Sequence, residues 1–192
     1  MIDDLGAASS GRCLARVRGG AIVLAEGSRS RASAEAALAC CDSLDDPESS
    51  PLLAASAALR RINTAPACAG SRVGILYAEH PRRASLAHIG DVRLWRCRGR
   101  LTEQVSDSTA ALSDAAGLAG ARPQMLRLDL PPGTRVVAGT RGIAALSVLD
   151  IYTLLSSARG AQATAEALVA LAAEAGQDIA VGVAYATRRT TR

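Results

Sequence analysis

The chain has 192 residues, of which 49% are hydrophobic and 21% charged, so we expect one globular domain over residues 1–192 rather than a disordered or fibrous protein. Its net charge of +4 comes from 22 arginines scattered along the chain, and aromatic residues make up only 2%, so few side chains could stack on bases and we expect no nucleic-acid binding. The acidic N-terminus and the absence of a long apolar run predict a cytoplasmic protein without membrane contact.

Five cysteines occur without CxxC spacing, and the chain has only two histidines. This pattern favours reduced, mostly buried thiols over a zinc site.

In chain order, the small and polar residues 1–12 make a poor start for a core, and the core is expected to span about residues 12–187. We expect the N-terminal residues and the arginine-rich tail 188–192 to be flexible. Runs of apolar and alternating residues predict strands at 14–17, 21–25, 73–78, 85–89, 92–97, 101–105, 125–130, 136–138 and 179–185. Residues with helical spacing predict helices at 32–44, 52–62, 147–155 and 161–175.

Two local signals are specific. Ser147 followed by Asp150 resembles a capping box at a helix start. The three strands within 85–105, joined by short glycine turns, read as a meander in the middle of a larger sheet.

The order of elements is strands, two helices, a run of strands, two helices and a last strand. This order disfavours a parallel βαβ repeat and indicates an α+β fold.

The sequence around the predicted central strands resembles that of the metal-dependent PPM-type serine/threonine phosphatases, also called the protein phosphatase 2C-like family. The chain looks like a shortened, bacterial-type member. Short motifs of that family occur in order between about residues 20 and 187. They are Glu26-Gly27 for the family's Asp-Gly, Gly70-Ser71 for Gly-Thr, Gly90-Asp91 for Gly-Asp, Thr140-Arg141-Gly142 for Ser-Asp-Gly, and Gln177-Asp178 for Asp-Asn. The resemblance implies two antiparallel sheets packed as a sandwich, with helix pairs on the outer faces.

The resemblance also implies two Mg²⁺ or Mn²⁺ ions held by carboxylates, and here the chain departs from the family. The family's first metal-binding carboxylate would fall near Arg12, which is a candidate phosphate contact instead. Asp3 or Asp4 could supply this carboxylate in another register. Glu26 keeps a carboxylate, and Gly27 can offer its carbonyl. The remaining departures are Arg141 and Gln177 in place of aspartates, with Asp178 one residue off.

Arg141 is the most informative change because a guanidinium stays charged and repels a dication. We hypothesise that Arg141 fills the space of a metal ion and pairs with Glu26 and Asp178. The simpler interpretations are that Glu26 and Asp91 are turn residues and that His80 and His88 are structural.

Three functions follow from these interpretations. The favoured one is a pseudophosphatase, with no cofactor, that binds and regulates a protein partner, including a phosphorylated one. The alternative is a divergent active phosphatase using one Mg²⁺ or Mn²⁺ ion, Glu26, Asp178 and an N-terminal aspartate. The third is an α+β interaction domain unrelated to the family.

Overall fold

The computed structural model of the chain describes residues 2–46, 50–80, 82–106, 115–118, 121–157 and 159–186. The strands are β1 (Ile2–Ser9), β2 (Cys13–Arg18), β3 (Ala21–Glu26), β4 (Arg72–His80), β5 (Arg83–Ile89), β6 (Val92–Arg98), β7 (Leu101–Gln104), β8 (Gln124–Asp129), β9 (Arg135–Thr140) and β10 (Ala180–Ala186). The α-helices are α1 (Arg31–Ala39), α2 (Pro51–Thr64), α3 (Val148–Ser156) and α4 (Ala161–Glu174), with short 3₁₀ helices η1 (Asp42–Asp45), η2 (Pro66–Cys68) and η4 (Arg141–Ala145).

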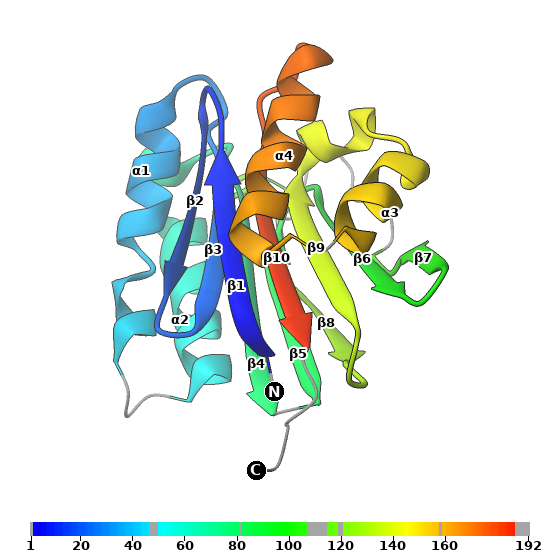
Figure 1. Cartoon of the computed structure of the whole chain (residues 1–192). Coiled ribbons are helices and arrows are strands. Elements are labelled where there is room, and N and C mark those ends of the chain that lie inside the picture. Colours follow the sequence, from blue (N-terminus) through cyan, green and yellow to red (C-terminus); the bar gives the residue numbers. More distant parts are fainter. Residues whose placement is uncertain are drawn as a thin grey trace.

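The strands form two five-stranded antiparallel sheets that pack face to face (Figure 1). One sheet has the order β1-β10-β9-β6-β7 and is covered on its outer face by α3 and α4. The other has the order β2-β3-β4-β5-β8 and is covered by α1 and α2. The α+β sandwich implied by the family resemblance is therefore confirmed.

Alternation along the inner strands divides the core into three layers. On β3, Ile22 and Leu24 face the other sheet, whereas Val23 and Ala25 face α1 and α2. All six residues of β3 are buried, because helices and the second sheet cover its two faces. This is why an apolar run without polar alternation marks the centre of each sheet.

The nine predicted strands and four predicted helices all form, with small shifts at their ends. Ser147 and Asp150 make the predicted capping box of α3, in which each side chain accepts a bond from the other residue's backbone N–H. The first helix ends earlier than predicted, at Ala39. Its freed carbonyl at Cys40 accepts a bond from Arg61 Nε at 3.1 Å.

The prediction of a flexible N-terminus and a core that starts near residue 12 is wrong. Residues Ile2–Ser9 form β1, which pairs with β10 as an edge strand. The small side chains have a packing reason, since a Cβ on Gly6 would lie 2.3 Å from the backbone of Ala161, where α4 begins. The tail 188–192 lies outside the described residues.

The predicted meander is also wrong. β5 and β6 belong to different sheets, and the chain passes from one sheet to the other at Gly90-Asp91. Gly90 has a φ of +83°, which residues with a side chain rarely adopt. A glycine turn between two strands looks the same in sequence whether the strands pair or diverge.

The sheets approach each other closely at Gly182 of β10, where a Cβ would lie 2.5 Å from Cγ2 of Ile22. We expect Gly182→Ala to lower the free energy of unfolding by about 1–3 kcal/mol through overpacking. Measured by urea denaturation, Gly182→Ala combined with Ile22→Ala should lose less than the sum of the single losses, because the second change removes the clash. Strict additivity would contradict this packing.

Candidate functional site

The candidate site lies at one end of the sandwich, where several strand ends meet. Because neighbouring strands are antiparallel, the end of β3 lies beside the start of β4, and the end of β9 beside the start of β10. The turn between β1 and β2 joins them, since Ser10 N donates to Ile179 O at 2.9 Å. A cavity of about 420 Å³ opens at this end, lined by Arg12, Glu26, Arg141, Gly142, Gly176, Gln177 and Asp178.

Glu26, the last residue of β3, is the buried charge of this site, with only 2% of its surface exposed. Its Oε1 accepts a bond from Arg72 Nη1 at 3.0 Å and a longer one from Arg12 Nη2 at 3.3 Å. Its Oε2 is buried without a hydrogen-bond partner among the described residues. Glu26 is therefore an internal anion held by two guanidinium groups rather than a solvated turn residue.

Arg72 belongs to the candidate site, although the sequence motifs do not point to it. It is the first residue of β4 and stands directly opposite Glu26 in the β3–β4 register. Its side chain is 13% exposed, against 46% for that of Arg12, so Arg72 is the buried partner of the carboxylate. The available signal was the register of β3 and β4, which places the two residues side by side.

Gly90 packs against the side chain of Arg72. A Cβ on Gly90 would lie 2.8 Å from Cγ of Arg72, so the turn that joins the two sheets also leaves room for this side chain. Asp91, the second residue of the motif, accepts bonds from Arg93 Nε at 3.1 Å and Arg93 Nη2 at 3.3 Å. His88 donates from Nδ1 to Gly90 O at 3.1 Å, and burial lowers its pKa. These residues build the turn that positions Arg72.

Arg141 does not make the ion pair that the sequence hypothesis gave it. It begins η4, lines the cavity and is exposed, and within the described part of the chain it has no ion-pair partner. Glu26 is already bonded to Arg12 and Arg72, which reach it from the turn before β2 and from β4. Arg141 therefore presents its charge to the cavity.

Asp178 lines the same cavity but is engaged with the β1–β2 turn. Its Oδ2 accepts a weak bond from the backbone N of Arg12 at 3.4 Å. A Cβ on Gly11 would lie 1.9 Å from Asp178 Oδ1, so this carboxylate rests directly on the glycine. Gln177 stands at the cavity wall beside it.

The remaining predicted positions are separate from the cavity wall. Gly27 forms the tight turn after β3, where a Cβ would lie 1.9 Å from Ser30 O. Asp4 accepts a bond from Ala161 N at 2.7 Å and so caps α4, about 20 Å along β1 from Ser10. The side chain of Asp3 lies outside the described residues.

Cys13 is the nearest thiol to the site and stands opposite Glu26 in the β2–β3 register. Burial, and after it the negative charge of Glu26, raises the pKa of Cys13 to about 12. A thiol in this environment remains protonated and is a poor nucleophile. All five cysteines are free, as expected, and four are buried.

These residues do not fit the two-metal centre of the PPM family. Such a centre needs several carboxylates free to bind dications. Here the Oε1 of Glu26 already accepts two guanidinium bonds, and Asp178 faces the backbone of the β1–β2 turn. Within the described ranges, no three His, Cys, Asp or Glu side chains gather as a metal cluster.

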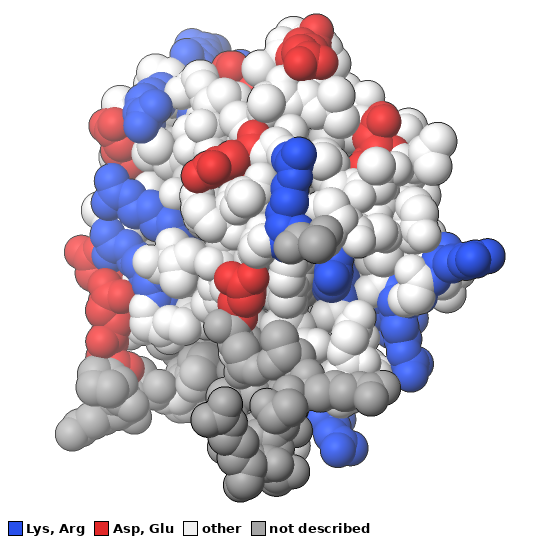
Figure 2. Space-filling model, in the orientation of Figure 1, with Lys and Arg blue, Asp and Glu red and all other residues white. Residues whose placement is uncertain are grey.

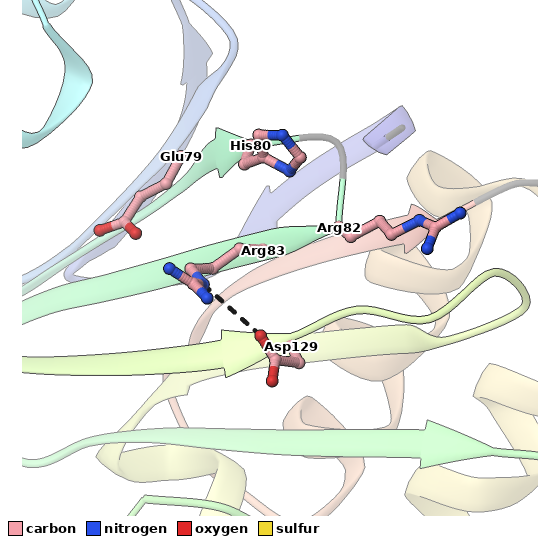
Figure 3. Close-up of a pocket in the computed structure, with 5 residues that line it drawn as sticks. All are labelled: Glu79, His80, Arg82, Arg83 and Asp129. Carbon is pink, nitrogen blue, oxygen red and sulfur yellow. Dashed lines mark hydrogen bonds and ion pairs between the residues drawn. The ribbon is translucent and has the colours of Figure 1, made fainter.

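A second cavity of about 410 Å³ lies at the opposite end of the sheets, lined by Glu79, His80, Arg82, Arg83 and Asp129 (Figure 3). Arg83 Nε lies 3.5 Å from Asp129 Oδ1, and their side chains are 53% and 78% exposed. The side chain of Arg82 points away from this pair, in the direction opposite to that of Glu79 (Figure 3). The exposed Arg83–Asp129 pair interacts weakly, and Glu79 already accepts bonds from Ser85 Oγ at 2.7 Å and Arg127 Nε at 3.4 Å.

Arg72 and Arg12 are expected to contribute very differently to stability. Arg72→Ala should lower the free energy of unfolding by about 3–5 kcal/mol, because it leaves a buried carboxylate with one exposed partner. Arg12→Ala should cost about 1 kcal/mol or less, since its side chain is half exposed.

Urea denaturation of both variants measures this difference, and equal losses would contradict it. The double variant Arg72→Ala with Glu26→Gln should recover part of the loss, because the unpaired charge is then removed as well.

Comparisons with known proteins find relatives only at the level of structure. No protein-family model and no curated protein matches the sequence. Among solved structures, PppA, "a key regulatory component of T6SS in Pseudomonas aeruginosa", superposes with a TM-score of 0.77 at 18% identity, covering 96% of this chain and 98% of that one.

Two mycobacterial proteins are equally similar. The serine/threonine phosphatase PstP/Ppp of Mycobacterium tuberculosis gives a TM-score of 0.77 at 17% identity, covering 98% of this chain and all of that one, 100%. The PPM Ser-Thr phosphatase MsPP from Mycobacterium smegmatis, in complex with cacodylate, gives 0.77 at 20%, covering 96% and 98%. The chain therefore has the fold of the PPM-type serine/threonine phosphatases over almost its whole length, as its sequence motifs imply.

Proposed function

We propose that this protein is a pseudophosphatase, which binds a phosphorylated protein partner and regulates it without hydrolysing the phosphate. The observation that supports this most strongly is the pair of guanidinium groups bonded to Glu26, at the position where the family resemblance would place metal ligands. A metal-bound water is the nucleophile of such phosphatases, and a guanidinium cannot ligate or activate water. In this proposal the arginines still bind phosphate, but the metal-bound water that would hydrolyse it is absent.

The charges of the cavity suit a phosphate group. Arg12 and Arg141 line the cavity with exposed guanidinium groups, which bind phosphate oxygens in pairs of parallel hydrogen bonds. Arg72 holds Glu26 from within, so Arg12 can turn towards a ligand without leaving that carboxylate unpaired. In this proposal Arg12 and Arg141 contact the phosphate and Arg72 is a positioning residue.

A protein partner fits the surface better than nucleic acid does. On the face shown in Figure 2, basic side chains lie in small groups among acidic ones and form no continuous basic surface. No described helix is long and apolar enough to cross a membrane. The fold neighbour PppA bears the description of a regulatory component, which agrees with a signalling role. We place this activity in the cytoplasm, where its free thiols would stay reduced.

Binding of a phosphoserine hexapeptide tests the proposal. We expect NMR titration to show saturable shifts of backbone amides around the cavity, and the unphosphorylated peptide to show none. Arg12→Ala and Arg141→Ala should each weaken binding about 10- to 100-fold, because each removes a charge-assisted hydrogen bond. Arg100→Ala, an exposed arginine in the β6–β7 turn, is the matched control and should bind unchanged. Equal losses in all three variants would indicate nonspecific attraction.

Hydrolysis of an aryl phosphate separates this function from the active-phosphatase alternative. Glu26 and Asp178 line one cavity, so the alternative deserves a direct assay. We expect no turnover above the protein-free rate with Mn²⁺ or Mg²⁺, because the guanidinium groups of Arg12 and Arg72 beside Glu26 repel a dication. Metal-dependent turnover abolished by Glu26→Ala would establish the enzyme instead.

A further inference from the structure

One oxygen of the site has no explanation in the function proposed so far. Glu26 lines the cavity and is 2% exposed, and while its Oε1 accepts two bonds, its Oε2 is buried with no partner among the described residues. A buried carboxylate oxygen is an acceptor that needs a donor. Oε2 can therefore accept a hydrogen bond that no described protein group supplies.

Arginines alone would favour the ligand with the largest negative charge, but the two carboxylates at the cavity reduce this preference. Arg12, Arg72 and Arg141 carry three positive charges, and Glu26 and Asp178 carry two negative ones, which leaves a single positive charge around the cavity. A doubly charged phosphate ester would overcompensate that charge. It would also bring only acceptor oxygens to Oε2 of Glu26.

We propose that the cavity binds a phosphate monoester in its singly protonated form, whose P–OH donates to Glu26 Oε2 while Arg12 and Arg141 hold the other oxygens. This inference rests on the proposed function. Arg12 is the residue that gives way, since its side chain is 46% exposed and its bond to Oε1, at 3.3 Å, is the longer of the two. Arg72 keeps Oε1 paired while the ligand reaches Oε2.

The selectivity that follows is for phosphate esters over sulfate esters. A sulfate ester has the same tetrahedral shape and a single charge but carries no proton, so it leaves Oε2 facing another acceptor. Such a mismatch between buried acceptors is penalised strongly. Glu26 would thus have a different role from the metal ligand at this position in the family. It would accept a hydrogen bond from the protonated phosphate oxygen and so distinguish phosphate from sulfate esters.

The groups that face Glu26 come from each neighbouring element. Arg12 precedes β2, Cys13 begins it and Arg72 lies on β4, whereas Arg141 after β9 and Asp178 before β10 line the same cavity. Arg31 of α1 approaches the β1–β2 turn by donating to Gly11 O at 3.4 Å, and its charge is offset by Glu35. A sulfated control ligand meets the same groups at the same pH, so any titration of the protein affects the two ligands together.

The test compares two identical hexapeptides, one with phosphoserine and one with sulfoserine. At about pH 5 most of the phosphate ester is singly protonated, because its second pKa lies near 6, and the two peptides then carry the same charge. NMR titration of the whole protein should show the phosphopeptide binding about 10-fold tighter or more, the equivalent of one missing hydrogen bond.

Each outcome has one meaning. Equal affinities at about pH 5, or phosphopeptide binding that appears only near pH 7.5 where the ester is doubly charged, would overturn the inference and leave the proposed function standing. No phosphopeptide binding at either pH would overturn both. A water molecule that satisfies Oε2 would produce equal affinities and so the first result.

Two variants locate the selectivity. Glu26→Gln keeps an oxygen for Arg72 and places an amide donor where Oε2 was, so the preference for phosphate over sulfate should fall to about 1-fold or reverse. Arg141→Gln should weaken the two peptides by the same factor and preserve their ratio. If Glu26→Gln does not fold, the wild-type comparison decides the question alone. If the phosphate-to-sulfate affinity ratio is lost in Arg141→Gln but kept in Glu26→Gln, the selectivity does not come from Glu26.

Discussion

The buried ion pair between Arg72 and Glu26 is the interaction on which the candidate site of this protein depends. A carboxylate at the inner end of β3 requires a positive partner, and in the PPM family that position belongs to metal coordination, as the resemblance implies. Here the partner is covalently part of the chain, fixed one strand away and packed against Gly90. A built-in cation neutralises the carboxylate without exchangeable ions. It cannot also supply a metal-activated water, and the proposed function, phosphate recognition without hydrolysis, rests on this difference.

The small residues of the chain make this convergence possible. With no Phe and 2% aromatic residues, the two sheets and the helices are separated mostly by Ala, Gly and aliphatic side chains. Backbones then approach closely, as Gly182 does to Ile22 and Gly6 to the start of α4. Close backbones bring the β1–β2 turn and β4 within side-chain reach of Glu26, and the residues between β9 and β10 line the same cavity.

The sequence motifs and the structure agree on the fold and differ on the site. The motifs lead to Arg12, Glu26, Arg141, Gln177 and Asp178, and the structure brings these residues to one cavity. The partner of Glu26 could not be deduced from them. Arg141 was the obvious candidate because it replaces an aspartate of the family, but it faces the cavity, and the two arginines that bond Glu26 lie 14 and 46 residues from it in sequence. Residue substitution at a motif says which ligand is lost, and it does not say which neighbour takes its place.

The sequence by itself determined where the four α-helices and every described strand except β1 form, because alternation, helical spacing and turn residues act over a few neighbouring positions. Only the tertiary structure decided that β1 completes a sheet, that β5 and β6 part at Gly90-Asp91, and that Arg72 rather than Arg141 neutralises Glu26. The physical reason is that strand pairing and burial join residues far apart in the chain. The energy of a buried charge depends on the groups within a few ångströms of it, whatever their separation along the sequence.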